Sequence, residues 1–298
     1  MSIPKHFGGH YSITKIISAG STCVMALGED ERAQKTVAVK VMSRKDSCSK
    51  DKIDSEISIL KRIDKGHPNI VKIYDVINFE DLVLIVMEYC SNGDLFELIV
   101  NSQIQSVSTK KKILKGIFGA IEYLHKECGI SHCDIKAENI VLNERFEPKL
   151  TDFGNAKAFE IGGDEAKDGT LLYAAPELLT GDTKFNTRKV DIYALGILMC
   201  TLFTGEFPYA AMSDDEHIIK QIIKGRLMFP QKMNRTLKAF ARRCTNIEPL
   251  KRPTIEEIVN FEWLDNIHHN QSISTEIPNI SKIERLNQTK ASGNVNEL

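Results

Sequence analysis

The sequence lacks paired cysteines, a leader segment and a hydrophobic run long enough to cross a membrane. Its seven cysteines are scattered and form no C-x-x-C pair, which argues against a structural zinc site and indicates reduced thiols in an intracellular compartment. The N-terminus MSIPKHFGGH has no apolar core of signal-peptide length and no second-position glycine for myristoylation. The most apolar run, Ala194–Phe203, is far shorter than a spanning helix and predicts a buried one. We therefore expect a soluble protein of the cytoplasm, the nucleus or both, with no membrane partner.

An excess of charge of one sign is missing as well. The net charge is −1, so the field of the whole molecule does not attract nucleic acid, and we expect no direct nucleic-acid partner. With 42% hydrophobic and 27% charged residues, the 298-residue chain has the composition of a globular protein with a proper core. Beyond Asp265 the sequence is rich in Asn, Ser, Thr and Gln, which predicts a polar, disordered tail over 265–298.

What is present centres on one stretch that holds Asp134, Asn139 and Asp152. The apolar segments Ile140–Leu142 and Pro148–Leu150 predict two short strands joined by a turn. Asn139 precedes the first strand and Asp152 follows the second, so both side chains are expected at one end of a hairpin. Phosphoryl transfer depends mainly on positioning and charge stabilisation, and it needs such a set: a carboxylate for the incoming hydroxyl, and a carboxylate and an amide that hold magnesium.

The same stretch resembles the eukaryotic protein kinases, whose catalytic loop H-R-D-x-K-x-x-N is followed by D-F-G. Here the two motifs read His132-Cys133-Asp134-Ile135-Lys136-Ala137-Glu138-Asn139 and Asp152-Phe153-Gly154. The resemblance implies that Asp134 accepts the substrate proton and that Lys136 neutralises the γ-phosphoryl group. It also implies that Asn139 and Asp152 hold Mg²⁺ on ATP. One position departs from the family pattern, because Cys133 stands where most members have Arg.

An earlier segment, Val37-Ala38-Val39-Lys40, resembles the family's V-A-I-K strand. The resemblance implies that Lys40 holds the α- and β-phosphates and needs an acidic partner. Apolar residues recur at helical spacing over Asp51–Ile63, and Glu56 lies beside that stripe. The resemblance assigns Glu56 as the partner of Lys40; Glu29, Glu31 and Asp54 are poorer candidates by position.

The glycine-rich loop is eroded, because the pattern G-x-G-x-x-G-x-V keeps only the central Gly20. By itself this segment is more typical of a plain hairpin turn, and only the motifs that follow it favour a nucleotide-binding loop. The run Asp81–Glu88 predicts a buried strand, whose end faces adenine in the family and would make Met87 the gatekeeper and Glu88–Cys90 the hinge. The residues that the resemblance implies for ATP binding are Ile17, Ser18, Ala19, Gly20, Ser21, Thr22, Cys23, Val24, Met25, Ala38, Lys40, Met87, Glu88, Cys90 and Asp94.

Later segments match the parts of a protein kinase that dock a peptide and support the fold. Gly169–Tyr173 and Ala175-Pro176-Glu177 resemble the docking segment and the A-P-E motif, and Thr170 with Lys136 is typical of Ser/Thr kinases. The implied docking residues are Glu138, Thr170 and Tyr173. The implied structural residues are Glu177, paired with buried Arg252, and Asp191, which would cap a buried helix and bind the catalytic-loop backbone.

Several carboxylates and lysines allow two interpretations. Asp94 and Glu138 match positions that receive upstream Arg residues of substrates in basophilic kinases, but they could equally be a helix cap and a surface residue. The long helix predicted over Ser108–Cys128 carries a run of three lysines, Lys110–Lys112, which we interpret as its solvated face and not as a basic binding signal.

Taken together, the sequence predicts an α+β protein with the bilobal protein-kinase fold. An extension (1–10) precedes an N-lobe (11–90) made of an antiparallel sheet and one main helix, and a mostly helical C-lobe (91–264). We expect a monomeric Ser/Thr kinase that uses ATP and Mg²⁺ on protein substrates, of the checkpoint or Snf1-like type. The alternative is a pseudokinase scaffold, suggested by the eroded loop. Since Cys133 replaces Arg and 155–168 contain no hydroxyl side chain, we expect activity without activation-loop phosphorylation.

Overall fold

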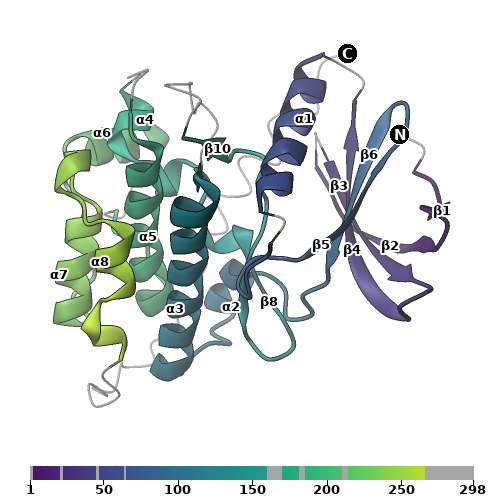
Figure 1. Ribbon diagram of the computed structural model, residues 1–298. Coiled ribbons are helices and arrows are strands. Elements are labelled where there is room, and N and C mark those ends of the chain that lie inside the picture. The colour runs from purple at the N-terminus through teal and green to yellow at the C-terminus, as the bar shows by residue number, and fades with distance from the viewer. Residues whose placement is uncertain are drawn as a thin grey trace.

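The computed structural model describes residues 3–20, 23–44, 47–63, 65–159, 170–180, 185–209 and 214–265, with the side chains of 47–49 excepted. The predicted tail after Asp265 and the candidate ATP contacts Ser21 and Thr22 lie outside these residues. Within them, a sheet and one long helix form one lobe, and a group of helices forms the other (Figure 1).

The N-terminal lobe is a six-stranded antiparallel sheet. In spatial order the strands are β1 (His6–Phe7), β2 (Tyr11–Ala19), β3 (Cys23–Asp30), β4 (Lys35–Ser43), β6 (Leu82–Glu88) and β5 (Ile73–Asn78). Strand β6 is buried over Leu82–Met87 because both of its faces are covered. The segment expected as a mere extension contributes β1, which pairs with β2 and buries Phe7.

Helix α1 (Ser47–Arg62) stands beside this sheet (Figure 1). Its apolar stripe, including Ile53 and Leu60, is buried, and the spacing of the stripe places Glu56 on the same inward side. The Glu56 carboxylate therefore lies in the interior of the lobe. Burying its charge costs free energy unless a cation pairs with it.

The C-terminal lobe is built around α5 (Thr187–Thr204), which is buried without a break from Val190 to Thr204. The apolar run in the sequence is therefore a core helix, as expected. Gly196 allows a close approach to the end of α7 (Arg235–Cys244), because a Cβ there would lie 2.7 Å from Thr245 and 2.8 Å from Cys244. The surrounding helices are α2 (Leu95–Val100), α3 (Val107–Tyr123), α4 (Pro176–Leu179), α6 (Asp215–Ile223), α7 (Arg235–Cys244) and α8 (Ile255–Val259).

Local sequence signals account for several ends of these helices. Asp94 caps α2 by accepting a 2.8 Å hydrogen bond from the Glu97 N–H. Thr254 and Glu257 form the expected capping box of α8. After α3 the chain makes one wider turn over Leu124–Cys128 and stops at Gly129, whose φ of 66° is left-handed.

Two short strand pairs lie between the lobes. The predicted hairpin is present as β8 (Ile140–Leu142) and β9 (Pro148–Leu150), which pair antiparallel. The second pair is formed by β7 (Ile130–Ser131) and β10 (Lys157–Ala158). The catalytic-loop stretch is consequently held by strands at both of its ends.

The interpretation of Lys110–Lys112 as a solvated face is wrong for Lys111. Its side chain is buried, its Nζ donates a 2.7 Å hydrogen bond to the Trp263 carbonyl, and it lies 4.2 Å from the centre of the Trp263 ring. Lys110 is half-buried near the Phe203 ring, and Lys112 alone of the three is exposed. The three lysines lie on neighbouring sides of α3, and the segment after α8, with Trp263, covers the side that carries Lys111.

Candidate active site

The end of the hairpin brings the polar residues of the catalytic stretch together. Asn139 ends a short turn just before β8, and its Nδ2 donates to the Asp134 carbonyl at 2.8 Å and to Asp134 Oδ2 at 3.0 Å. Asp152 follows β9 and has a φ of 63°. A left-handed φ at a non-glycine residue costs about 1–3 kcal/mol, so surrounding contacts must hold Asp152 in place.

The Lys40 ammonium group joins the two lobes. Its Nζ lies 2.7 and 3.0 Å from the two carboxylate oxygens of Glu56, and 3.0 Å from Asp152 Oδ1. Burial alone would lower the pKa of Lys40, but the carboxylates of Asp152 and Glu56 outweigh it and raise this pKa, so the ammonium group stays charged. Burial likewise opposes the charged form of Asp152, yet Lys40 lowers the pKa of this carboxyl below its ordinary value. This part of the site therefore keeps a charged ammonium group at the wall of the cleft.

A second cation lies on the other side of Asp134. Lys136 Nζ donates to Asp134 Oδ2 at 2.8 Å and to Thr170 Oγ1 at 2.9 Å. Thr170 therefore ties the segment before α4 to the catalytic loop. Tyr173, from the same segment, is buried and its hydroxyl accepts a 3.3 Å hydrogen bond from the Ala137 N–H. Of these two docking candidates, Thr170 contacts Lys136 of the catalytic loop through its side chain. Tyr173 instead holds the backbone of that loop at Ala137.

The Asp191 side chain holds the backbone that precedes Asp134. Its oxygens accept hydrogen bonds from the His132 N–H at 2.9 Å and the Cys133 N–H at 2.8 Å, and His125 Nε2 lies 2.8 Å away. Cys133 has a φ of 63° and is buried, so this contact fixes a strained residue. The expectation that Asp191 caps its helix is wrong, because α5 begins earlier and Asn186 is its N-cap.

Glu177 and Arg252, which are far apart in the sequence, form a bidentate ion pair. Arg252 Nη1 and Nη2 lie 2.6 and 2.7 Å from the two oxygens of Glu177, with both side chains almost fully buried. Arg252 also donates to the carbonyls of Lys189 and Asn246, each at 2.8 Å. The pair thereby joins α4, the start of α5 and the loop before α8.

A cleft of about 630 Å³ opens above these groups, between the sheet and the hairpin. Most candidate ATP contacts line it: Ile17, Ser18, Cys23, Met25, Ala38, Lys40, Met87, Glu88, Cys90 and Asp94. Ala19, Gly20 and Val24 do not. Val24 packs on the opposite face of the sheet, because side chains alternate along β3 while Cys23 and Met25 face the cleft side.

Several lining residues were not predicted from the sequence, among them Lys15, Leu27, Val141 and Thr151. Leu27 continues the alternation of Cys23 and Met25, and that period of two could have identified it. Val141 belongs to the hairpin that carries Asn139. The family motifs specify only the positions within them, so they do not predict apolar lining residues such as Leu27 and Val141.

The donors at the cleft fit magnesium chemically. Asn139 and Asp152 both line the cleft and offer an amide and a carboxylate oxygen, the hard oxygen ligands that Mg²⁺ takes together with phosphates. Within the described residues no group of three or more His, Cys, Asp or Glu could hold a metal by itself. A magnesium ion here would therefore depend on the phosphates for much of its coordination.

Two further carboxylates flank the cleft on the side of the C-terminal lobe. Burial raises the pKa of Glu138 and of Asp94, and the two charges also disfavour each other. The Oε2 atom of Glu138 is buried with no hydrogen-bond partner among the described residues. Such a pair is poised to accept a cation.

Comparison with known proteins agrees with this geometry. The model of the protein kinase domain family matches residues 11–264. The chain is 30% identical over 265 residues to the carbon catabolite-derepressing protein kinase of Secale cereale, covering 86% of this chain and 52% of that protein. It is 31% identical over 271 residues to the serine/threonine-protein kinase kin-29 of Caenorhabditis elegans, covering 89% of this chain and 32% of that protein. The chain thus spans about half or less of these relatives. In the described part of the chain, no helix is both long and apolar enough for a membrane span.

Proposed function

The chain belongs to the protein kinase family, and we propose that it is an active enzyme that transfers the γ-phosphate of ATP to Ser or Thr residues of proteins. The observation that carries this proposal is the bridging position of Lys40 between Glu56 and Asp152, at 2.7 and 3.0 Å. A protein that has lost phosphoryl transfer has no need to maintain this buried arrangement of charges, since each charge is costly to bury.

Each residue has a definite task in this mechanism. Asp134 orients the substrate hydroxyl and accepts its proton, while Lys136 lies 2.8 Å from Asp134 and offsets charge on the transferred group. Lys40 holds the α- and β-phosphates. Asn139 and Asp152 would hold magnesium, which neutralises charge on the phosphates when bound. Loss of one such electrostatic partner should lower turnover about 10²-fold or more.

A transfer assay separates the active enzyme from a pseudokinase scaffold. Radiolabelled ATP and a generic Ser/Thr peptide are incubated with the wild type and with Asp134→Asn, which keeps the shape of the side chain. We expect label on the peptide with the wild type and a large loss with the variant. Equal background from both proteins would overturn the enzyme and favour the scaffold.

We further propose that substrates carry basic residues before the target hydroxyl. The support is the raised pKa of Asp94 and Glu138 and the unpartnered Glu138 Oε2, which a guanidinium group would satisfy. A positional peptide library should show preference for upstream Arg, reduced in Glu138→Gln. Absence of any basic preference in the wild type removes this proposal.

Regulation by activation-loop phosphorylation is not expected for this chain. Cys133 is buried and its thiol donates a 3.8 Å hydrogen bond to the Ser131 carbonyl, so it cannot bind a phosphate as Arg would. The segment 155–168 has no Ser, Thr or Tyr; its residues from 160 onward lie outside the described ones. The receiver and the acceptor of the phosphate are absent together.

We propose the Snf1-like group for this chain, and its similarity to the carbon catabolite-derepressing protein kinase supports this. The checkpoint type, with a cell-cycle role, is the alternative. We also propose a monomer of the cytoplasm or nucleus. Five described cysteines, Cys90, Cys128, Cys133, Cys200 and Cys244, are in the thiol form, which supports a reducing compartment.

A further inference from the structure

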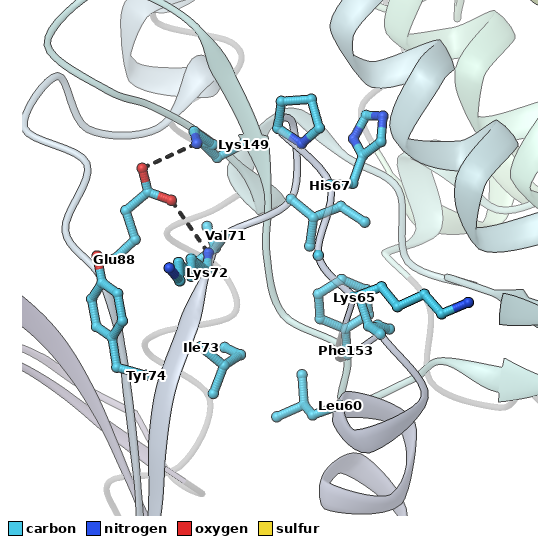
Figure 2. Close-up of a pocket in the computed structure, with 14 residues that line it drawn as sticks. Leu60, Lys65, His67, Val71, Lys72, Ile73, Tyr74, Glu88, Lys149 and Phe153 are labelled. Atoms are coloured by element: carbon cyan, nitrogen blue, oxygen red, sulfur yellow. Dashed lines mark hydrogen bonds and ion pairs between the residues drawn. The ribbon is translucent and has the colours of Figure 1, made fainter. Parts of the chain in front are cut away.

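The chain after Asp152 is held at two points, and at each of them an aromatic ring packs on a histidine. At the first point, Phe153 of the D-F-G motif is buried, and its ring centre lies 5.2 Å from that of His132. Phe153 also lines a cavity of about 510 Å³ together with Leu60 of α1 (Figure 2). The second point is Phe159, which belongs to none of the kinase motifs in this sequence.

Phe159 directly follows β10 and makes two ring contacts. Its ring centre lies 5.9 Å from that of His125 with the ring planes at 70°, an edge-to-face geometry that favours attraction between aromatic rings. The Arg188 guanidinium group lies over the same ring, 4.5 Å from its centre, which is within the range of a cation–π interaction. The half-buried ring of Phe159 therefore joins the turn after α3 to the first turn of α5.

His125 connects Phe159 to the backbone of the catalytic loop. Its Nε2 lies 2.8 Å from Asp191 Oδ2, and since a carboxylate only accepts hydrogen bonds, Nε2 is the donor. The same Asp191 oxygen accepts from the His132 N–H at 2.9 Å, and the other oxygen accepts from the Cys133 N–H at 2.8 Å. Phe159 thus packs against the imidazole ring that orients the carboxylate holding the loop.

The elements that carry these contacts are themselves tied together. Strand β7 pairs with β10, and the Phe159 N–H donates a 3.0 Å hydrogen bond to the Gly129 carbonyl just before β7. The Ser131 hydroxyl of β7 donates a 2.8 Å hydrogen bond to Thr187 Oγ1, and Arg188 is the next residue of α5. The positions of the ring and of the guanidinium group are therefore fixed by strand and helix backbone.

We propose that Phe159 is a positioning residue for the proposed phosphoryl transfer, on which this inference rests. Its ring, in contact with His125 and Arg188, holds the start of the activation loop against the catalytic loop. In many kinases an Arg before the catalytic Asp makes such a connection by binding a phosphate on the activation loop, whereas Cys133 is buried and cannot. The contacts of Phe159 require no modification, which fits the expected activity without activation-loop phosphorylation.

The kinetics of peptide phosphorylation test this role through a double-mutant cycle. Phe159→Ala should lower kcat about tenfold, because both ring contacts are lost. The KM for ATP should stay within about twofold of the wild-type value, since Phe159 does not line the nucleotide cleft. Phe159→Tyr keeps the ring and should keep most of the wild-type kcat. Arg188→Gln should lower kcat about threefold in the wild type but have no effect in Phe159→Ala, because the guanidinium group acts through the ring.

Hydrogen exchange of the catalytic-loop amides gives a readout that needs no turnover. In Phe159→Ala the His132 and Cys133 amides, which Asp191 holds, should exchange about tenfold faster than in the wild type. Arg235→Gln is the matched control for Arg188→Gln, because Arg235 is likewise an exposed arginine in the first turn of a helix, α7. It should change neither kcat nor the exchange rates.

The proposal is overturned if Phe159→Ala changes neither kcat nor the exchange rates, if Phe159→Tyr loses as much activity as Phe159→Ala, or if the effect of Arg188→Gln persists without the ring. If Phe159→Ala failed to fold, Arg188→Gln at its exposed position would still decide, and behaviour equal to Arg235→Gln would refute the proposal. A wild type without transfer would refute the proposed activity, whereas the exchange rates would still show whether Phe159 holds the loop.

Discussion

The contact between Asp191 and the catalytic loop makes a quantitative prediction for Asp191→Asn. An aspartate offers two acceptor oxygens, whereas an asparagine offers one oxygen and one NH₂ donor. One Asp191 oxygen accepts from the Cys133 N–H and the other from the His132 N–H, at 2.8 and 2.9 Å, and Asp191 is fully buried. Whichever way the amide is turned, its NH₂ group faces a backbone N–H and leaves that donor unsatisfied.

The expected cost follows from the buried position. An unsatisfied buried donor costs about 1–3 kcal/mol, and the remaining hydrogen bond loses the strength of a charged acceptor, so we expect a total near 3 kcal/mol. In a domain of this size each kcal/mol lowers Tm by roughly 2–4 °C, which gives a fall of about 6–12 °C. Because Cys133 is held at a φ of 63° by this contact and directly precedes Asp134, turnover should fall further than stability explains.

Thermal unfolding and peptide phosphorylation below the transition measure the two effects. Asp214→Asn is the matched control, because Asp214 is half-exposed and caps α6, and asparagine caps a helix about as well as aspartate. The control should change stability by less than about 1 kcal/mol. If Asp191→Asn behaved like this control in both assays, the reasoning that Asp191 holds the loop would be refuted.

Three further outcomes are expected. Arg252→Met should lower the free energy of unfolding in urea by about 3–5 kcal/mol, because it leaves the buried Glu177 carboxylate unpaired. Arg243→Met, at an exposed ion pair, should lower it by less than about 1 kcal/mol. Similar losses in both variants would contradict the buried-pair assignment. Burial and the nearby Lys232 charge lower the pKa of Lys110 to about 8 from 10.5, so the unfolded chain binds more protons between these values and stability should rise with pH there. Lys110→Met should flatten that rise, and an unchanged slope would exclude Lys110 as its source. Protein made in bacteria should keep its peptide-kinase rate after phosphatase treatment, since Cys133 cannot bind a loop phosphate; a rate that depends on an upstream kinase would contradict this.

Much of the site follows from short-range features of the sequence. The hairpin around Asn139 and Asp152 depends on two apolar triplets and a turn between them, which act over a few residues. The capping box at Thr254 and the cap at Asp94 are likewise local hydrogen bonds that residue type and spacing predict. The order of charged motifs identifies the family, and the match over residues 11–264 agrees with it.

Contacts between distant segments decided the remainder. Lys111 is buried because residues after α8 pack against α3. The helical spacing of apolar residues does not predict whether another segment will cover a given side of a helix. Asp191 looked like a helix cap, but it lies inside α5 and binds a loop that precedes it by more than fifty residues. The sequence by itself determined which groups the chain carries and the local elements that present them; the tertiary structure alone decided which groups are desolvated and which face one another, because burial and charge pairing depend on every segment packed nearby.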